Sequence, residues 1–213
     1  MSVQKAFTAS LVLLSLGGCA KVGDIDVTGG IVAARSACPM VGIPNYTGDI
    51  TLFNPPESRE ARAIDIVANI TNLRSTCDDS GAQIYTQATF DVLARRSDPT
   101  GARDVTLPYF ATVMRGGTAV VSKRVGQVTV HFEDGQYRAS ASDSAQSYVD
   151  KGQATLPADI QERITRKRKA GDSDAAVDPM ADPAVRAALQ RTSFELLVGF
   201  NLTQDQLKYN VTR

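Results

Sequence analysis

The sequence has no tryptophan, a single histidine and no net charge over its 213 residues. Nucleic-acid-binding domains are typically strongly basic, so 23 Lys and Arg against 23 Asp and Glu argue against that class. The sequence also has neither a Gly-x-Ser-x-Gly nucleophile motif nor a glycine-rich phosphate loop followed by Lys-Ser or Lys-Thr. We therefore expect no enzymatic activity, no cofactor and no nucleic-acid partner.

Metal-ligating side chains are scarce as well. His131 is the only histidine, and the cysteines are Cys19, Cys38 and Cys77. A structural zinc site needs four nitrogen or sulfur ligands, and one histidine with two cysteines that can pair with each other does not supply them. Val130 and Phe132 alternate with His131, so we expect a histidine on a polar surface rather than a general base.

Long apolar runs are almost absent too. The one candidate extends from Ala6 to Leu16, follows Lys5 and ends at Gly17-Gly18. This order of a basic residue, an apolar stretch and small residues is typical of a secretory signal peptide. The run is shorter than the ~20 residues that a membrane-spanning helix needs, and no other run approaches that length. We therefore predict that residues 1–18 form a signal peptide.

The segment Leu16-Gly17-Gly18-Cys19 resembles the lipobox of bacterial lipoproteins. The resemblance implies cleavage before Cys19, a diacylglycerol thioether on its sulfur, and an acyl chain such as palmitate on its new amino group. Stable anchoring takes more than one acyl chain, and this modification supplies them. The alternative is an ordinary signal peptide in which the cysteine stands by chance.

Residues 19–36 are rich in glycine and predict a tether between the lipid and the folded domain, with a span of about 20–25 Å. In bacterial lipoprotein sorting, an aspartate directly after the lipidated cysteine tends to retain the protein at the inner membrane. Here Ala20 and Lys21 follow the cysteine. The resemblance therefore implies the outer membrane, with the domain facing the periplasm or the outside.

If Cys19 carries lipid, Cys38 and Cys77 are an even pair in an oxidising compartment, where disulfides persist. We predict a disulfide between Cys38 and Cys77, and the alternative is two buried free thiols. Closing a loop of about 40 residues stabilises a fold by about 4 kcal/mol in the chain-entropy account.

From Thr47 onward, apolar residues recur with a period of two. This pattern predicts strands at residues 50–52, 62–73, 84–95, 104–114, 120–124, 128–132, 137–149 and 194–202. Gly116-Gly117 and Asp134-Gly135 are signals for tight hairpins. We predict that residues 37–213 form an antiparallel β-sandwich like immunoglobulin or fibronectin type III modules, with the serine-rich segment 137–149 at an edge. A small closed barrel is the alternative.

Residues 157–190 break this pattern and predict a flexible, partly helical insert in the sandwich. Ile160 and Ile164 have helical spacing, and Asp182-Pro183 is typical of the start of a helix, with an aspartate cap and a proline in the first turn. Thr203 is expected to cap a further helical turn near the end of the sequence.

The insert carries a cluster of basic residues that suggests a function. Its members are Arg163, Arg166, Lys167, Arg168 and Lys169. Such a cluster suits anionic lipid headgroups or phosphates, at about 1 kcal/mol per charge near a membrane surface. The alternative is a solvated helix end whose charge is balanced by the acidic residues just downstream, Asp172, Asp174 and Asp178.

Two segments, Leu107-Pro108-Tyr109-Phe110 and residues 194–210, resemble a family of alphaproteobacterial envelope lipoproteins that has no assigned activity. The resemblance covers most of the mature chain except residues 157–182. It implies the compartment and the fold, and it implies no catalytic residues. We therefore expect a non-enzymatic interaction or structural module with an envelope protein as its partner. A carrier of an apolar ligand between the sheets and an envelope hydrolase are the alternatives.

Overall fold

The computed structural model describes residues 36–166, 171 and 177–213. The predicted signal peptide, the predicted lipidation site Cys19 and the tether up to residue 35 lie outside the described residues. Among the residues that are described, no helix is long and apolar enough to cross a membrane.

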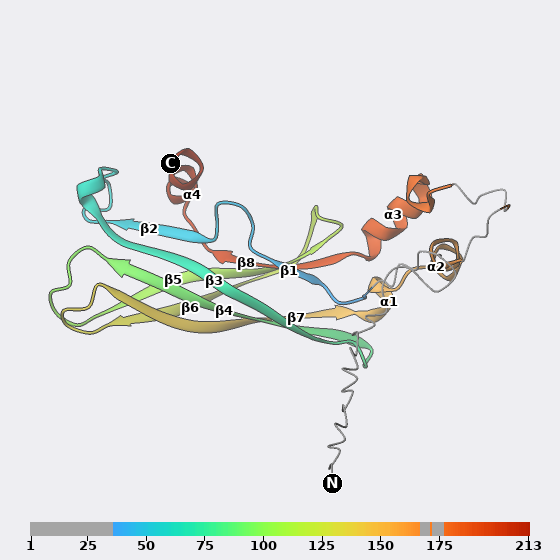
Figure 1. Ribbon diagram of the computed structural model, residues 1–213, viewed down its shortest axis with the longest axis horizontal. Coiled ribbons are helices and arrows are strands. Elements are labelled where there is room, and N and C mark those ends of the chain that lie inside the picture. Colours follow the sequence, from blue (N-terminus) through green and yellow to red (C-terminus); the bar gives the residue numbers. More distant parts are fainter. Residues whose placement is uncertain (1–35, 167–170, 172–176) are drawn as a thin grey trace, which may run out of the picture.

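The described residues form eight strands in two packed sheets, which confirms the predicted all-β sandwich (Figure 1). The first sheet has the order β1-β8-β5-β6 and contains β1 (Met40–Gly42), β8 (Phe194–Phe200), β5 (Arg103–Arg115) and β6 (Ala119–Phe132). The second sheet has the order β2-β3-β4-β7 and contains β2 (Asp49–Phe53), β3 (Ile64–Asp78), β4 (Gln83–Arg96) and β7 (Arg138–Asp150). Neighbouring strands are antiparallel except β1 and β8, which run parallel. The serine-rich strand β7 lies at an edge, as predicted.

The core lies between the sheets and follows from the alternation along the strands. In β4, every second side chain from Ile84 to Ala94 is buried. Across the core, the rings of Phe90 in the second sheet and Tyr109 in the first meet edge to face, with centroids 5.1 Å apart. Full burial of a large apolar side chain contributes about 1.5–3 kcal/mol. The period of two that predicts the strands therefore also holds the two sheets together.

Two strands differ from the sequence-based prediction. β6 is one continuous strand, whereas the sequence predicts separate strands at residues 120–124 and 128–132. The first half of β6 is exposed on both of its faces, so burial imposes no alternation there. β1 is not predicted at all, because three residues are too few to show a period.

The predicted insert is partly helical, and its helices form a second small core at one end of the sandwich, the helical end (Figure 1). The helical end contains α1 (Lys151–Ala154), which precedes the predicted insert, followed by α2 (Ala158–Thr165), the 3-10 turn η2 (Pro179–Ala181) and α3 (Pro183–Thr192). Ile160 of α2 packs with Val185 and Ala188 of α3. The predicted cap of α3 is present, since the Asp182 carboxylate accepts a hydrogen bond of 2.7 Å from the backbone N–H of Ala184.

The C-terminal helix α4 (Gln204–Thr212) lies against β2, the edge strand that follows β1. Thr203 and Gln206 form a capping box at its start, as expected for the predicted cap. The side-chain amide of Asn210 donates hydrogen bonds of 2.8 Å to the backbone carbonyls of Tyr46 and Asp49. A short 3-10 turn, η1 (Ala61–Ala63), precedes β3.

The two ends of the sandwich are fixed by different means. At the helical end, the predicted disulfide joins Cys38 to Cys77 of β3, with the sulfur atoms 2.06 Å apart. At the opposite end, which we call the loop end, Arg96 is only 2% exposed and its Cζ lies 5.2 Å from the centroid of the Phe132 ring. The Arg96 guanidinium donates hydrogen bonds of 2.6–2.8 Å to backbone carbonyls of the loops after β4 and β6, at Pro99, Gly101, Glu133 and Gln136. One buried cation thus holds both loops.

Candidate functional site on the two outer faces

The outer face of the first sheet carries an apolar area near the helical end. Strand register places Met40, Glu195, Met114 and Val120 in one row across β1, β8, β5 and β6. The following rows bring Leu197 beside Thr112, and Phe110 beside Val125. We call the apolar members of these rows the apolar patch: Met40, Phe110, Met114, Val120, Val125 and Leu197.

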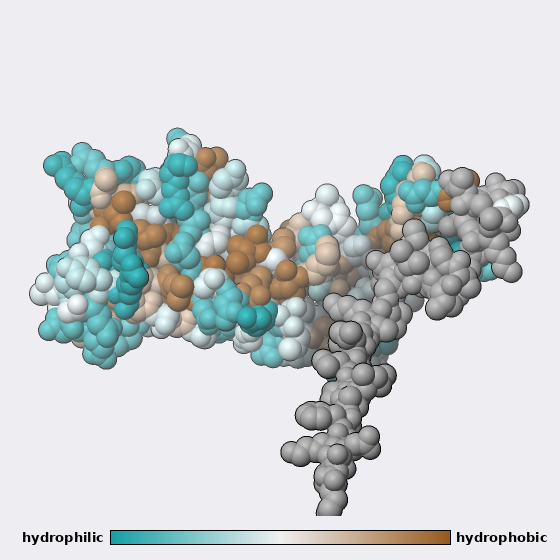
Figure 2. Space-filling model, viewed as in Figure 1, coloured by the Kyte–Doolittle hydropathy of each residue, from teal (hydrophilic) through white to brown (hydrophobic). Residues whose placement is uncertain are grey.

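The apolar patch is open to solvent at its edges. Met40, Val120 and Val125 are 68%, 63% and 58% exposed, and the other members are half-buried. Hydrophobic side chains also gather over the middle of the face that Figure 2 shows, near β1 and β8 (Figure 1). β6 is an edge strand, and beyond it no further strand pairs among the described residues. Exposed apolar patches and open strand edges are typical sites for the docking of another chain.

A cation accompanies the apolar patch. Lys123 on β6 lies with its Nζ 5.3 Å from the centroid of the Phe110 ring, whereas Arg124 beside it is on the opposite side of β6 and lines the hollow toward β7. Lysine on an edge strand is a common protection against unspecific pairing with other strands. Lys123 also gives this apolar surface a positive charge on the side of β6.

Toward the loop end, the same outer face becomes polar around His131. Its Nδ1 lies 2.6 Å from Oδ1 of Asp104, and its Nε2 lies 3.3 Å from Oε1 of Glu133. These carboxylates raise the pKa of His131, and the hydrogen bond to Asp104 is the largest cause. The side chain is 53% exposed on the polar face that the alternation predicts. Within the described part of the chain, no three His, Cys, Asp or Glu side chains gather as ligands for a metal.

The outer face of the second sheet is polar along β4 and β7. Asp91 accepts hydrogen bonds from the hydroxyl of Ser142 at 2.7 Å and from the amide of Asn72 at 2.8 Å. These bonds lower the pKa of Asp91, and the bond from Ser142 contributes most. Arg74 in turn donates from Nε to Oδ1 of Asn72 at 3.0 Å. The charged groups in this part of the face are therefore bonded to neighbours on the same face.

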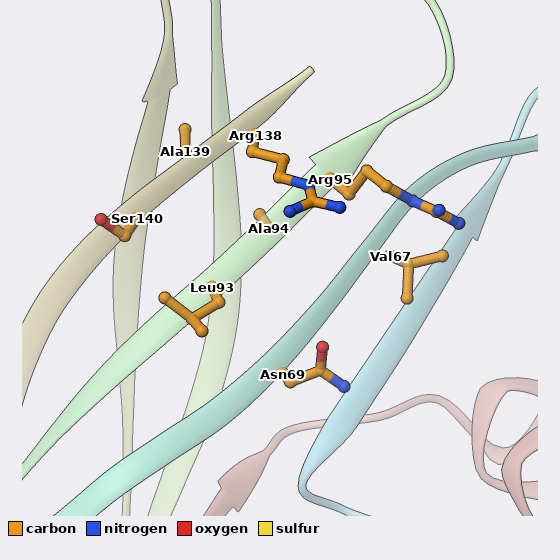
Figure 3. A pocket seen from close by; sticks show the side chains of 8 residues that line it. All are labelled: Val67, Asn69, Leu93, Ala94, Arg95, Arg138, Ala139 and Ser140. Atoms are coloured by element: carbon orange, nitrogen blue, oxygen red, sulfur yellow. The ribbon is translucent and has the colours of Figure 1, made fainter. Parts of the chain in front are cut away.

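The loop end of this second face is different. Arg95 of β4 and Arg138 of β7 stand directly opposite each other in the strand ladder. They border a shallow hollow of about 500 Å³, which we call the arginine groove, lined by Val67, Asn69, Leu93, Ala94, Arg95, Arg138, Ala139 and Ser140 (Figure 3). Figure 3 shows Asn69 and Ser140 on either side of Leu93, with the two arginine side chains extending over the sheet beside them.

The two guanidinium groups of the arginine groove carry charge that the face does not neutralise. Like charges directly opposite each other destabilise a sheet. In the part of the chain that the structure describes, neither Arg95 nor Arg138 is bonded to a carboxylate. The acidic residue at this end of β3, Asp65, accepts hydrogen bonds of 2.9 and 2.7 Å from Arg103 instead. A pair of adjacent cations thus faces solvent together.

The sequence does not reveal either surface. Alternation assigns Arg95 to the polar side of β4, but it does not say which residue of β7 lies opposite. The same holds for Met40 and Val120, which are brought into one row by β8 and β5. The sequence does contain a signal for Arg96. This residue continues the alternating buried positions of β4 after Ala94, and a buried cation needs hydrogen-bond partners inside the protein.

The predicted basic cluster is described in part. Arg163 forms an ion pair with Asp182, the cap of α3, and so links α2 to α3. Arg166 lines a hollow beside this pair together with Asp178. The other members, Lys167, Arg168 and Lys169, lie outside the described residues. Arg163 is therefore paired with an acidic residue of the insert, which is not one of the three aspartates named in the prediction.

A smaller hollow of about 230 Å³ opens between β6 and β7. Tyr109 borders it and donates a hydrogen bond of 3.2 Å to the carbonyl of Ser144. Burial raises the pKa of Tyr109 to about 12. Sites for small molecules usually have volumes of about 300–1,000 Å³. This hollow is therefore small for the apolar ligand that a carrier would hold between the sheets.

Known proteins provide no assignment for these surfaces. No family model matches the chain, and no curated protein or solved structure matches it either. The function is therefore inferred from the chemistry of the surface, above all from the apolar patch and the arginine groove.

Proposed function

We propose that this chain is a lipid-anchored lipoprotein of the bacterial envelope whose β-sandwich binds a partner protein through the apolar patch and catalyses no reaction. The apolar patch is the observation that carries the proposal. It joins exposed side chains of β1 and β6 into one surface beside an open strand edge. Isolated apolar side chains are common on protein surfaces, whereas gathered ones are typical of contacts with another protein.

The chemistry of the patch defines the partner. Val120, Val125 and Met40 present apolar area, and Lys123 adds positive charge on the same side of β6. The open edge of β6 offers backbone groups to an added strand. We therefore expect a partner segment that is extended, apolar on one side and acidic on its rim.

The anchor is inferred from the lipobox-like segment that ends at Cys19, and Ala20 after it favours the outer membrane. The described chain begins at the helical end, where Cys38 is bonded to Cys77 (Figure 1). A lipid on Cys19 would therefore hold that end nearest the membrane. Met40 follows Cys38 closely, so the apolar patch lies toward the anchored end. The expected partner is accordingly a protein bound to the same membrane.

Cross-linking in intact cells, followed by recovery of the lipidated full-length protein from membranes, tests the role of the patch. The variant Val120→Glu with Val125→Glu places two carboxylates in the patch, and Val211→Glu is the matched control at a valine of α4 that is 52% exposed. We expect the wild type and the control to recover the same partner protein. The patch variant should recover at least about ten-fold less of it. Equal recovery by the patch variant would contradict the proposal, as would the absence of a reproducible partner in several detergents.

Separation of the two membranes on a sucrose gradient tests the anchor. Wild-type protein is expected to band with the outer membrane, Ala20→Asp with the inner membrane, and Cys19→Ala away from the outer membrane, because it has no acyl chain to hold it there. Wild-type protein at the inner membrane would overturn the outer-membrane assignment. Banding of Cys19→Ala with the outer membrane would overturn the lipid anchor itself.

A further inference from the structure

We propose that the arginine groove is a binding site for a phosphomonoester, held by the guanidinium groups of Arg95 and Arg138. The inference depends neither on the lipid anchor nor on the apolar patch, because the groove lies on the other sheet. It assigns a ligand class to a face that the proposed function leaves unused.

The positive charges of Arg95 and Arg138 favour an anionic ligand. Arg95 and Arg138 are direct cross-strand neighbours, and no carboxylate among the described residues neutralises them. Elsewhere on this face the carboxylate of Asp91 has its partners in place. A phosphomonoester carries a charge of about −1.5 to −2 at pH 7, so it matches two cations, whereas one carboxylate matches only one. The planar fork of arginine also fits phosphate oxygens in pairs.

The lining of the groove adds neutral polar groups and an apolar wall. Register places Asn69, Leu93 and Ser140 in one row across β3, β4 and β7 (Figure 3). The amide of Asn69 and the hydroxyl of Ser140 are exposed and add neutral donors for phosphate or ester oxygens. Leu93 is 51% exposed and, with Val67, provides an apolar wall. The groove therefore suits a phosphate on an organic body better than a bare ion.

The strand ends that carry Arg95 and Arg138 are fixed by the buried Arg96. The backbone N–H of Arg96 donates a hydrogen bond of 3.0 Å to the carbonyl of Tyr137, and its guanidinium donates one of 2.7 Å to the carbonyl of Gln136. Those two residues directly precede Arg138, while Arg96 directly follows Arg95. The buried Arg96 thus fixes the strand ends that carry the two exposed cations, and a preorganised site loses less entropy on binding.

The position of the groove bears on the source of the phosphate. Thr86 of β4 lies opposite Cys77, and the stretch of β4 from Thr86 to Arg95 is about 30 Å long at about 3.3 Å per residue. The groove is therefore at the far end of the sandwich from the disulfide and from the start of the described chain (Figure 1). Under the proposed anchoring, a soluble phosphomonoester reaches it more readily than a headgroup of the same membrane.

Isothermal titration of the full-length protein in a neutral detergent and a chloride buffer tests the site. The probes are inorganic phosphate, glycerol 3-phosphate and dihexanoyl phosphatidic acid below its micelle concentration. We expect saturable binding of the phosphomonoesters, weakened about ten-fold or more in Arg95→Gln with Arg138→Gln, because two charge-assisted hydrogen-bonding groups are lost. Comparable affinity for glycerol 3-phosphate and the lipid assigns a soluble ligand, and much tighter binding of the lipid assigns a headgroup.

Arg74→Gln is the matched control, since Arg74 is an exposed arginine on the same face of the second sheet. It should leave the affinity unchanged. The ligand-free double variant should melt no lower than the wild type, because it relieves a like-charge contact, and this separates lost binding from lost folding. The proposal is overturned if the wild type binds none of the probes saturably, or if the double variant binds them as tightly as the wild type does.

Discussion

The two outer faces of the sandwich rest on one core but present different chemistry to solvent. On the first sheet, exposed Met40, Val120 and Val125 gather beside an open strand edge. On the second sheet, the face is polar, and Arg95 and Arg138 stand together without a carboxylate among the described residues. Inward positions must be apolar to form the core, whereas outward positions are free of that demand. Outward residues that differ from an ordinary polar surface therefore indicate where the protein binds other molecules.

The largest expected loss of stability comes from mutation of Arg96, the buried residue next to the arginine groove. Arg96→Met removes the buried guanidinium and its four hydrogen bonds to backbone carbonyls of both loops, so we expect the free energy of unfolding to fall on the order of 3–5 kcal/mol. Urea denaturation measures the loss, with the exposed neighbour in Arg95→Gln as the control within about 0.5 kcal/mol of the wild type. Equal stability of the two variants would show that Arg96 does not hold the loop end.

A smaller effect is expected on the side of the apolar patch, from the disulfide between Cys38 and Cys77. Replacing both cysteines by serine frees the segment that carries β1 and Met40, and should lower the free energy of unfolding by about 2–4 kcal/mol. Partner recovery should fall with it, while phosphate binding should stay. Denaturation with and without reductant measures the effect. Two thiols that alkylate before reduction would contradict the bond.

The smallest effect concerns His131, at the polar end of the face that carries the patch. Its pKa is raised in the folded chain, chiefly by Asp104, so its stabilising contribution is complete below the ordinary histidine pKa of about 6.5 and is lost as the pH rises through the raised value. The melting temperature of the wild type should therefore fall relative to His131→Gln between about pH 5.5 and 8.5. A difference that does not change with pH would rule out this contribution. The effect is small because the pair is exposed.

Much of the fold follows from local sequence, because alternation and caps are local signals. The long strands other than β6, the cap at Asp182 and the disulfide are predicted correctly, the last because two cysteines remain once Cys19 is set aside. The apolar patch and the arginine groove are not predictable in this way. Each depends on which residues of different strands meet, and the pairing of Arg95 with Arg138 is set by the register of β4 and β7. Local periodicity fixes which face of a strand a residue occupies, but it does not say which residues of two strands distant in sequence stand opposite each other.

We propose that the two outer faces of the sandwich have separate binding functions. Partner recovery from cross-linked membranes tests it most directly when the wild type is compared with two double variants, Val120→Glu with Val125→Glu in the apolar patch and Arg95→Gln with Arg138→Gln in the arginine groove. We expect the patch variant to lose the partner protein and the groove variant to recover as much of it as the wild type does. Retention of the partner by the patch variant, or its loss from the groove variant, would contradict separate functions of the two faces.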